Sequence, residues 1–358
     1  MWPDDGQQGG SRRLRAVVDL HVLPHRWPLG MGVDPSGRFL IADSNPARLW
    51  DSASGRCVLT IPNFTADTVN WAFSGTGDVL ITGGRDRYAR LWDCVSGRLL
   101  QVLRGHWRGV RCVALGADGL TAVTGSDDGR MRTWEATTGR RLQTLRPHDG
   151  PVYSVAVDGS GAIALCGNRD AVTMWDARTG GRLHRLDKLG GIAWIVRLSE
   201  DGRNAFALAD ETIRVWDTAT GHRMHAFPVR TDCWQASALT YRGGVAVIGG
   251  VDGKTTVWDV HSGELLHTLV GHSGKVSSVA VSADSRIVLT GSADGTARLW
   301  NLQSGQRVTQ FDEHTASVES VALSADARIA VTCSQDGTLR VRKLDWTTQP
   351  GQPGEPAQ

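Results

Sequence analysis

Tryptophan residues recur along this chain at an almost constant interval. Successive members of the series are 42, 42, 41, 41, 42 and 42 residues apart, and each is followed by Asp, Glu or Asn. The series consists of Trp50, Trp92, Trp134, Trp175, Trp216, Trp258 and Trp300. A register that holds through seven copies predicts a repeat protein, in which one supersecondary unit is stacked many times.

The clearest copy of the unit spans residues 271–306. Its short β-branched and apolar runs are separated by turn residues and predict strands at 276–281, 287–290, 297–300 and 308–311. Two of the connections contain Gly295 and Gly305, and glycine supplies the positive φ that tight turns need. One unit is therefore predicted to be a four-stranded antiparallel meander.

These repeats resemble the WD40 repeat family. The resemblance rests on the Gly271-His272 pair, the Trp-Asp-like pairs and the period, and it covers roughly residues 13–344. An eighth copy places Arg342 where the other copies have Trp. Membership of this family implies an all-β propeller made of four-stranded blades.

The number of predicted third strands favours eight blades. Third strands end at the seven tryptophans and at Arg342, and residues 13–17 resemble the outer strand at 141–145. A propeller must close its ring, because an open ring leaves a long unpaired strand edge. We therefore predict eight blades, with the N-terminal strand completing the last one. Because the first unit is degenerate, a seven-bladed ring with an N-terminal extension is the alternative.

Composition and termini bound the organisation of the chain. We predict a disordered tail at 1–12, the propeller domain at 13–345 and a disordered Pro/Gly/Gln tail at 346–358. No apolar run approaches the roughly 18 residues of a membrane span, and no secretory signal opens the chain. The six Cys include no CxxC pair, and the 39 basic residues include only four Lys. We expect a cytoplasmic protein with reduced cysteines, from a GC-rich bacterial genome.

A His, Thr, Asp and Trp set recurs at fixed offsets. The copies are His106, Thr124, Asp128 and Trp134; His272, Thr290, Asp294 and Trp300; and His314, Thr332 and Asp336 without the Trp. A near match has Cys in place of Thr and one residue deleted, and consists of His148, Cys166, Asp170 and Trp175. Asp, His and a hydroxyl can form a nucleophilic site. Repetition argues against catalysis, and the family resemblance instead implies a structural hydrogen-bond relay.

The other sequence patterns that could indicate a catalytic or cofactor site are incomplete. The Ser273-Gly274-Lys275 stretch lacks the upstream Gly of a phosphate-binding loop, and no His or Cys cluster has zinc spacing. Residues 176–180 and 217–221 superficially resemble turns of eight-bladed quinone-dependent dehydrogenases, but they belong to the Trp-Asp register. We expect a non-enzyme with no cofactor and no metal.

Binding is the remaining class of function. In the WD40 family, the loops before the first strand and those between the second and third strands share one face of the disc, the usual partner surface. Trp and Arg dominate interface hot spots. The residues of these loops that we predict to bind a partner are Arg26, Trp27, Arg85, Arg87, Trp107, Arg108, Arg169, Trp194, Arg230, Trp234 and Lys254. For Trp194 and Trp234, a place in the channel wall is the alternative.

We expect a scaffold or adaptor that uses this face to hold a protein or peptide, one with acidic groups. The formal net charge of +2 implies no nucleic-acid partner, and we expect no membrane partner. One alternative is a sensor or regulatory propeller that acts with a separately encoded effector, such as a kinase, a protease or an NTP-dependent switch. A propeller enzyme is a more remote alternative.

Overall fold

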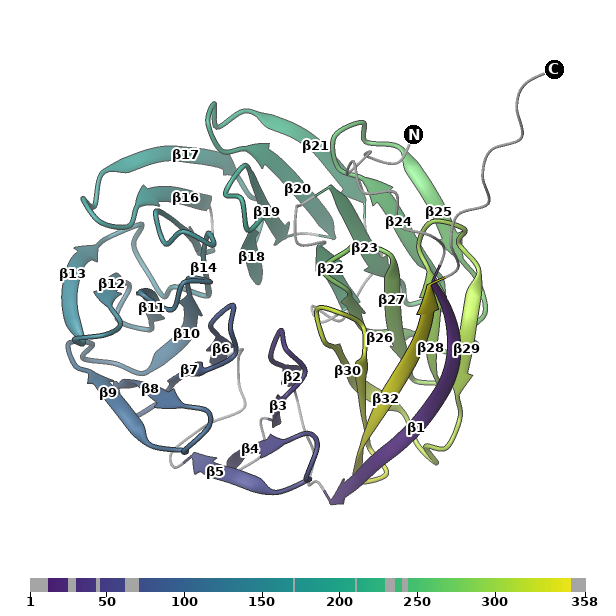
Figure 1. The fold of residues 1–358 in the computed structure, drawn as a ribbon. Helices are drawn as coiled ribbons and strands as arrows, with labels where there is room; N and C mark the ends of the chain where they lie inside the picture. Colours follow the sequence, from purple (N-terminus) through teal and green to yellow (C-terminus); the bar gives the residue numbers. More distant parts are fainter. Residues whose placement is uncertain are drawn as a thin grey trace.

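The structure is a computed structural model that describes residues 12–24, 30–42, 46–61, 71–169, 171–209, 211–228, 236–239 and 244–348. These residues contain no α-helix and form eight four-stranded antiparallel sheets arranged in a ring (Figure 1). The prediction of eight blades is therefore confirmed, and the seven-bladed alternative is wrong. In the described part of the chain, no helix is long and apolar enough to span a membrane.

Blades one to four are meanders of consecutive strands, each named from the channel outward. Blade one contains β2 (Met31–Val33), β3 (Phe39–Ala42), β4 (Ala47–Asp51) and β5 (Cys57–Ile61). Blade two contains β6 (Trp71–Phe73), β7 (Val79–Gly83), β8 (Ala89–Asp93) and β9 (Leu99–Leu103). Blade three contains β10 (Val110–Leu115), β11 (Thr121–Ser126), β12 (Met131–Glu135) and β13 (Arg140–Leu145). Blade four contains β14 (Ser154–Val157), β15 (Ile163–Gly167), β16 (Ala171–Asp176) and β17 (Arg182–Lys188).

Blades five to seven follow the same order. Blade five contains β18 (Ile195–Leu198), β19 (Asn204–Ala209), β20 (Thr212–Asp217) and β21 (Arg223–Pro228). Blade six contains β22 (Ser237–Leu239), β23 (Val245–Gly249), β24 (Thr255–Asp259) and β25 (Leu265–Leu269). Blade seven contains β26 (Val276–Val281), β27 (Ile287–Ser292), β28 (Ala297–Asn301) and β29 (Arg307–Phe311).

Blade eight joins the two ends of the chain. Its strands are β30 (Val318–Leu323), β31 (Ile329–Ser334), β32 (Thr338–Thr348) and β1 (Arg12–Pro24), in that order from the channel. β1 pairs antiparallel with β32 along its whole length, and Figure 1 shows the two strands side by side at the rim. The predicted closure by the N-terminal strand is therefore confirmed.

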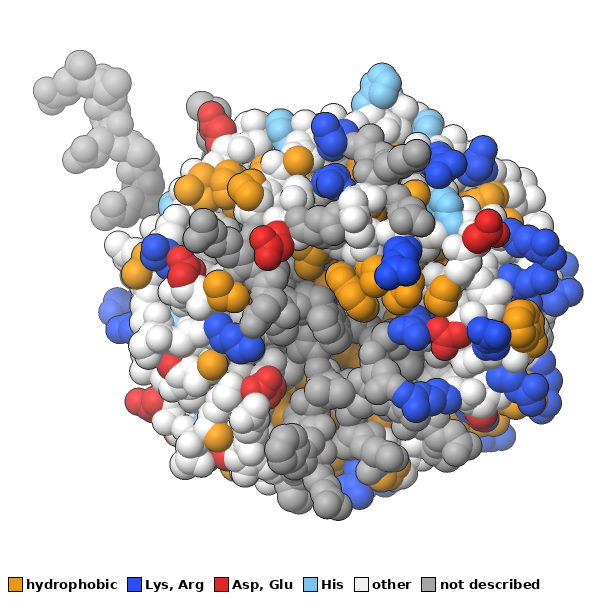
Figure 2. Space-filling view, turned by 180° about the vertical axis from the view of Figure 1, so that it is seen from behind, with side chains coloured by type: hydrophobic (Ala, Val, Ile, Leu, Met, Phe, Trp, Pro, Cys, Tyr) orange, Lys and Arg blue, Asp and Glu red, His pale blue; other side chains and the backbone are white. Residues whose placement is uncertain are grey.

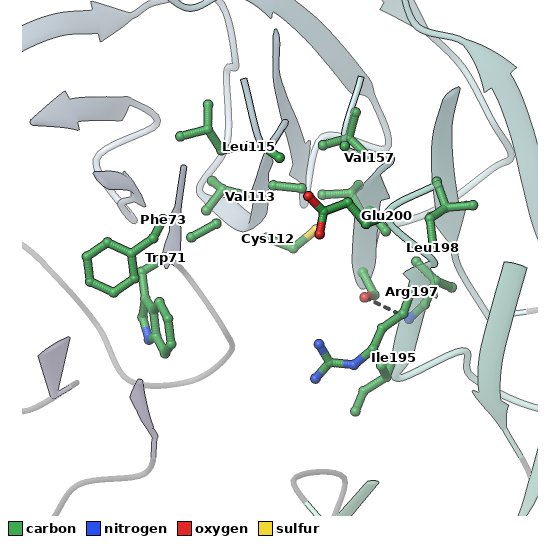
Figure 3. Close-up of a pocket in the computed structure, with 18 of the residues that line it drawn as sticks. Trp71, Phe73, Cys112, Val113, Leu115, Val157, Ile195, Arg197, Leu198 and Glu200 are labelled. Carbon is green, nitrogen blue, oxygen red and sulfur yellow. Dashed lines mark hydrogen bonds between the residues drawn. The ribbon is translucent and has the colours of Figure 1, made fainter. Parts of the chain in front are cut away.

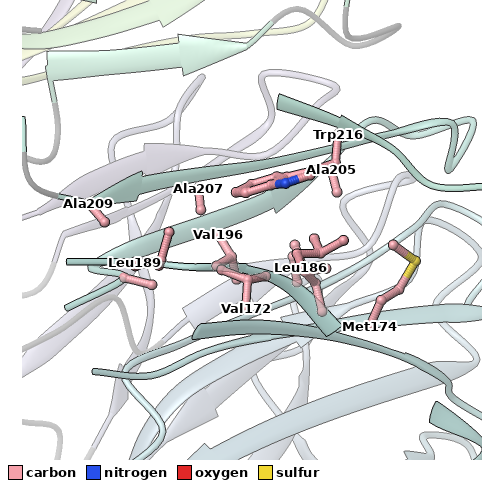
Figure 4. Packing of buried hydrophobic residues seen from close by; sticks show 12 residues of the cluster. Val172, Met174, Leu186, Leu189, Val196, Ala205, Ala207, Ala209 and Trp216 are labelled. Atoms are coloured by element: carbon pink, nitrogen blue, oxygen red, sulfur yellow. The ribbon is translucent and has the colours of Figure 1, made fainter. Parts of the chain in front are cut away.

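Apolar side chains fill the spaces between neighbouring blades. Between blades four and five, Val172, Met174 and Leu186 face Val196 and Trp216 (Figure 4), and all five are buried. Burial of apolar surface stabilises the fold by roughly 25 cal/mol per Å². Since each blade contributes one face to each of two such layers, the ring is held together as a single unit.

Candidate partner-binding site on the loop face

Backbone hydrogen bonds join the loops of neighbouring blades on the face predicted to bind partners. In each bond, a residue at or near the start of an inner strand donates its N–H to a carbonyl at the end of the preceding blade's second strand or one residue beyond it. The bonds are Val110 to Gly84 (3.0 Å), Val152 to Ser126 (3.1 Å), Ala193 to Asn168 (2.8 Å) and Val276 to Gly250 (3.0 Å). These loops, which we call the loop face, therefore form a connected layer rather than separate flaps.

The repeated polar set holds the same loops to the sheets. In blade seven, Trp300 Nε1 donates to Thr290 Oγ1 at 2.9 Å, and Thr290 Oγ1 lies 2.8 Å from His272 Nε2. The other ring nitrogen of His272, Nδ1, donates to Asp294 Oδ2 at 2.9 Å. Blades three and eight repeat the His–Thr and His–Asp bonds at 2.8 to 2.9 Å. The predicted relay is therefore present, and each side chain in it has a hydrogen-bond partner in the next one.

The protonation of this relay suits a structural role. Burial lowers the pKa of His272, which keeps the imidazole neutral. Burial by itself would raise the pKa of Asp294, but hydrogen bonds from Thr296 and His272 outweigh it and lower the pKa to about 2. The Thr290 hydroxyl is fully buried, so no substrate can reach it. The relay therefore positions the loops and does not activate a nucleophile.

Trp107 and Arg108 form the most exposed aromatic–cation pair of the predicted set. The Trp107 side chain is 55% exposed, and the Arg108 guanidinium lies 4.9 Å from the centroid of its ring. The backbone N–H of Trp107 donates to Asp128 Oδ2 at 3.3 Å, so the relay of blade three anchors this loop. An indole held on a rigid loop loses little entropy when a partner covers it.

Arg85 and Arg87 lie on the adjoining loop of blade two. Both are exposed, and Arg87 has a φ of 75°, in the left-handed region that non-glycine residues rarely adopt. A Cβ built on Gly109 would lie 3.4 Å from the Arg85 Cα, so the two loops are in contact. The loop that carries Arg85 and Arg87 in blade two thus touches the loop that carries Trp107 and Arg108 in blade three.

Trp194 belongs to a different group, at the mouth of the central channel. It is 53% exposed and packs edge-on against Tyr153, with ring centroids 5.7 Å apart. The Arg111 guanidinium lies 5.2 Å from the Tyr153 ring, and Arg111 Nε donates to Asp127 Oδ1 at 2.7 Å. Sequence reasoning missed Arg111 and Tyr153. Their spacings of 42 and 41 residues along the series 111, 153 and 194 were the available signal.

The remaining predicted residues are more scattered. Arg169 is exposed on blade four, and Lys254 of blade six pairs with Asp252, with Nζ and Oδ2 3.4 Å apart. Four predicted residues lie outside the described part of the chain, namely Arg26, Trp27, Arg230 and Trp234. Of the predicted residues, Arg85, Arg87, Trp107 and Arg108 are the four that lie on two contacting loops.

Figure 2 shows the face opposite to that of Figure 1. Lys and Arg side chains gather over the half of the disc that holds blades two to four, and hydrophobic side chains lie beside them near the middle.

Among the described residues, no group of three or more His, Cys, Asp or Glu side chains is placed to hold a metal ion.

Comparison with known families agrees with this geometry. The family model "WD domain, G-beta repeat" matches residues 55–93, 97–135, 139–176, 263–301 and 305–342, which together make up more than half of the chain. The chain belongs to the WD40 repeat family. The matched WD40 segments include the three blades with the complete His–Thr–Asp relay.

Solved structures also share the architecture of this WD40 propeller. The crystal structure of the computationally designed Ika8 protein aligns with a TM-score of 0.74, over 91% of this chain and 99% of that chain. At 23% sequence identity, this likeness shows the fold alone. Among curated proteins, none matches this WD40 chain significantly.

Proposed function

We propose that this WD40 propeller is a non-enzymatic scaffold that holds a protein or peptide partner on the loop face of blades two and three. The observation that supports it is the Trp107–Arg108 pair, in which a half-exposed indole and a guanidinium share a loop anchored by Asp128. Trp and Arg in such a setting are the residue types that carry most interface energy. WD40 propellers typically act as protein-interaction scaffolds.

Local charges favour a partner with acidic groups. The nearby carboxylates already have cationic partners, because Asp86 pairs with Arg90 at 2.5 Å and Asp127 pairs with Arg111 at 2.7 Å. No carboxylate in the described residues pairs with Arg87 or Arg108, which leaves two exposed guanidinium groups available. Guanidinium binds carboxylates through two parallel hydrogen bonds. An acidic segment with at least one apolar side chain therefore fits both the arginines and the indole.

Affinity capture from the native host tests this proposal. Three baits are compared: the parent protein, a loop-face variant carrying Trp107→Ala, Arg85→Glu and Arg87→Glu, and a rim control carrying Leu99→Ala. Leu99 is a 47% exposed hydrophobic residue on the outer strand β9 of blade two. We expect at least one protein to be captured by the parent and the rim control but not by the loop-face variant. Capture of the same proteins by all three baits would contradict the proposal.

A further inference from the structure

The channel of the propeller contains a cavity of about 1370 Å³. Inner strands of several blades line it, and its wall on blade two is aromatic. Trp71 and Phe73 stand there with their ring centroids 5.9 Å apart, and Figure 3 shows both rings across the cavity from β18. The cavity therefore offers a large apolar wall.

The pairing of strands defines one equivalent position on the inner strand of every blade. The residue at this position lies opposite a residue of the second strand, and that residue lies opposite the third-strand residue that precedes the Trp, or Arg342 in blade eight. In chain order the eight residues are Gly32, Ala72, Ala114, Ala156, Arg197, Ala238, Ala280 and Ala322. Seven blades therefore have Gly or Ala here, and blade five alone has Arg.

Crowding near the axis explains the small residues. A Cβ built on Gly32 would lie 1.8 Å from a ring carbon of Trp71 on the neighbouring blade, so even one added carbon does not fit there. At the same position in blade five, the long Arg197 side chain extends into the open cavity (Figure 3). Packing between the inner strands therefore does not account for an arginine at this place.

The Arg197 guanidinium has no charged or hydrogen-bonding partner in the described part of the protein. The Arg197 side chain is solvent-exposed within the cavity, and desolvation by the surrounding channel wall lowers the pKa of Arg197. Glu200, also in the cavity wall, has its pKa raised by burial, which favours the neutral acid. Arg111 already pairs with Asp127. Glu211 also lines the cavity, and no ion pair or hydrogen bond joins it or Glu200 to the Arg197 guanidinium in the described part of the chain. Arg197 is thus a cavity cation that no described carboxylate pairs with.

We propose that the central cavity is a binding site for a carboxylate attached to an apolar body. The carboxylate accepts hydrogen bonds from Arg197, and the apolar body packs against Trp71 and Phe73. A guanidinium is suited to this role because its planar donors match both carboxylate oxygens. The ligand is either a free organic acid or an acidic side chain of a bound peptide. This site does not depend on the partner surface proposed for the loop face.

Calorimetric titration of the full chain with phenylacetate tests the site, and phenylacetamide serves as the uncharged analogue. We expect saturable binding of phenylacetate and at least tenfold weaker binding of the amide. Arg197→Ala should abolish this preference and still fold, because Ala occupies the position in six other blades. Arg307→Ala, an exposed change on the outer strand β29, should leave it unchanged.

Equal affinity for the acid and the amide, no saturable binding of the acid, or full binding by a folded Arg197→Ala protein would each overturn the proposal. Titration with acetyl-Asp-Phe-amide separates the two sources of the ligand. Tighter Arg197-dependent binding of this peptide than of phenylacetate indicates an acidic side chain, and the reverse order indicates a free acid. The loop-face variant should bind phenylacetate like the parent, so loss of the loop-face function is distinguishable from loss of this site.

Discussion

Arg342 in blade eight donates from Nη1 to Thr332 Oγ1 at 3.0 Å. In blade seven, the equivalent bond is donated by Trp300 Nε1 to Thr290 Oγ1 at 2.9 Å. An arginine therefore replaces the indole as the hydrogen-bond donor of the relay. The absence of Trp from the eighth repeat leaves the polar network intact.

The Arg342 guanidinium also connects blade eight to the closing strand. Nη2 donates to Glu313 Oε2 at 2.6 Å, and Nε lies 3.0 Å from Asp19 Oδ1 on β1. Its carbon lies 4.6 Å from the centroid of the Phe311 ring in blade seven. A Trp at this position would have one N–H donor and could not also bind both carboxylates. The one repeat that has Arg in place of Trp is thus the blade formed by both ends of the chain.

Arg342→Met tests this account, because Met keeps much of the volume and has no donor. We expect the free energy of unfolding to fall by about 1 to 3 kcal/mol, since Thr332 loses a buried donor and two carboxylates lose their partner. Lys343→Met changes the next, half-exposed residue and should stay within about 0.5 kcal/mol of the parent. Urea denaturation of the three proteins measures both values. Equal losses would show that Arg342 only fills space.

Deletion of residues 1–24 tests ring closure. It removes β1 and leaves β32 as an unpaired edge next to an open gap in the rim. We expect aggregation or loss of the cooperative thermal transition. A protein lacking residues 1–10 keeps β1 and is the matched control. The closure account is wrong if both deletions melt like the full chain.

Asp294→Ala tests the relay. The change removes the acceptor for His272 Nδ1 and for the backbone N–H of Ser273, at 2.9 and 3.0 Å. A loss of roughly 1 to 3 kcal/mol in unfolding free energy is expected for stranded buried donors. Asp312→Ala removes an exposed carboxylate and should have little effect. If denaturant melts show equal losses, the relay does not contribute to stability.

Acid should destabilise the protein in two steps. Burial lowers the pKa of His106, His272 and His314 below the ordinary 6.5, so the unfolded chain takes up protons more readily than the folded one. This contribution is fully present above about pH 6.5 and is lost as the pH falls. Asp294 and Asp336, with pKa values of about 2, add a second loss between about pH 4 and pH 2.

Urea midpoints measured from pH 8 to pH 4 check the first step. His272→Asn should reduce the slope below pH 6.5, because one titrating group is removed. His222→Asn, which changes an exposed histidine, should not. Stability that rises as the pH falls through 6 would contradict the assigned protonation states.

The features that recur with the repeat period could be predicted from the sequence. Eight blades follow from counting the seven tryptophans together with Arg342. Constant offsets located the His, Thr and Asp residues, and the resemblance to the WD40 family implied that they form a relay. The interactions of Arg342 with Asp19 were not predicted, because they depend on a strand 323 positions away and on the side chain that happens to lie opposite it.

Arg197 escaped prediction for a different reason. The number of residues between the equivalent inner-strand position and the Trp is not constant. It is one or two residues smaller in blades one, four and five than in the other blades, so the Trp period does not align the inner strands. Only the pairing of strands shows that Arg197 shares a ring position with Ala114 and Gly32. Arg111 and Tyr153 were missed likewise, since their contacts with each other and with the predicted Trp194 form between blades.

The affinity of a captured partner for the Trp107→Ala protein tests the central claim most directly. The parent, Trp107→Ala and the rim control Leu99→Ala are titrated with the same purified partner. We predict that Trp107→Ala weakens binding by about 2 kcal/mol or more and leaves the thermal melt unchanged, while Leu99→Ala binds like the parent. A Trp107→Ala protein that binds as tightly as the parent would contradict the assignment of the partner site to the loop face.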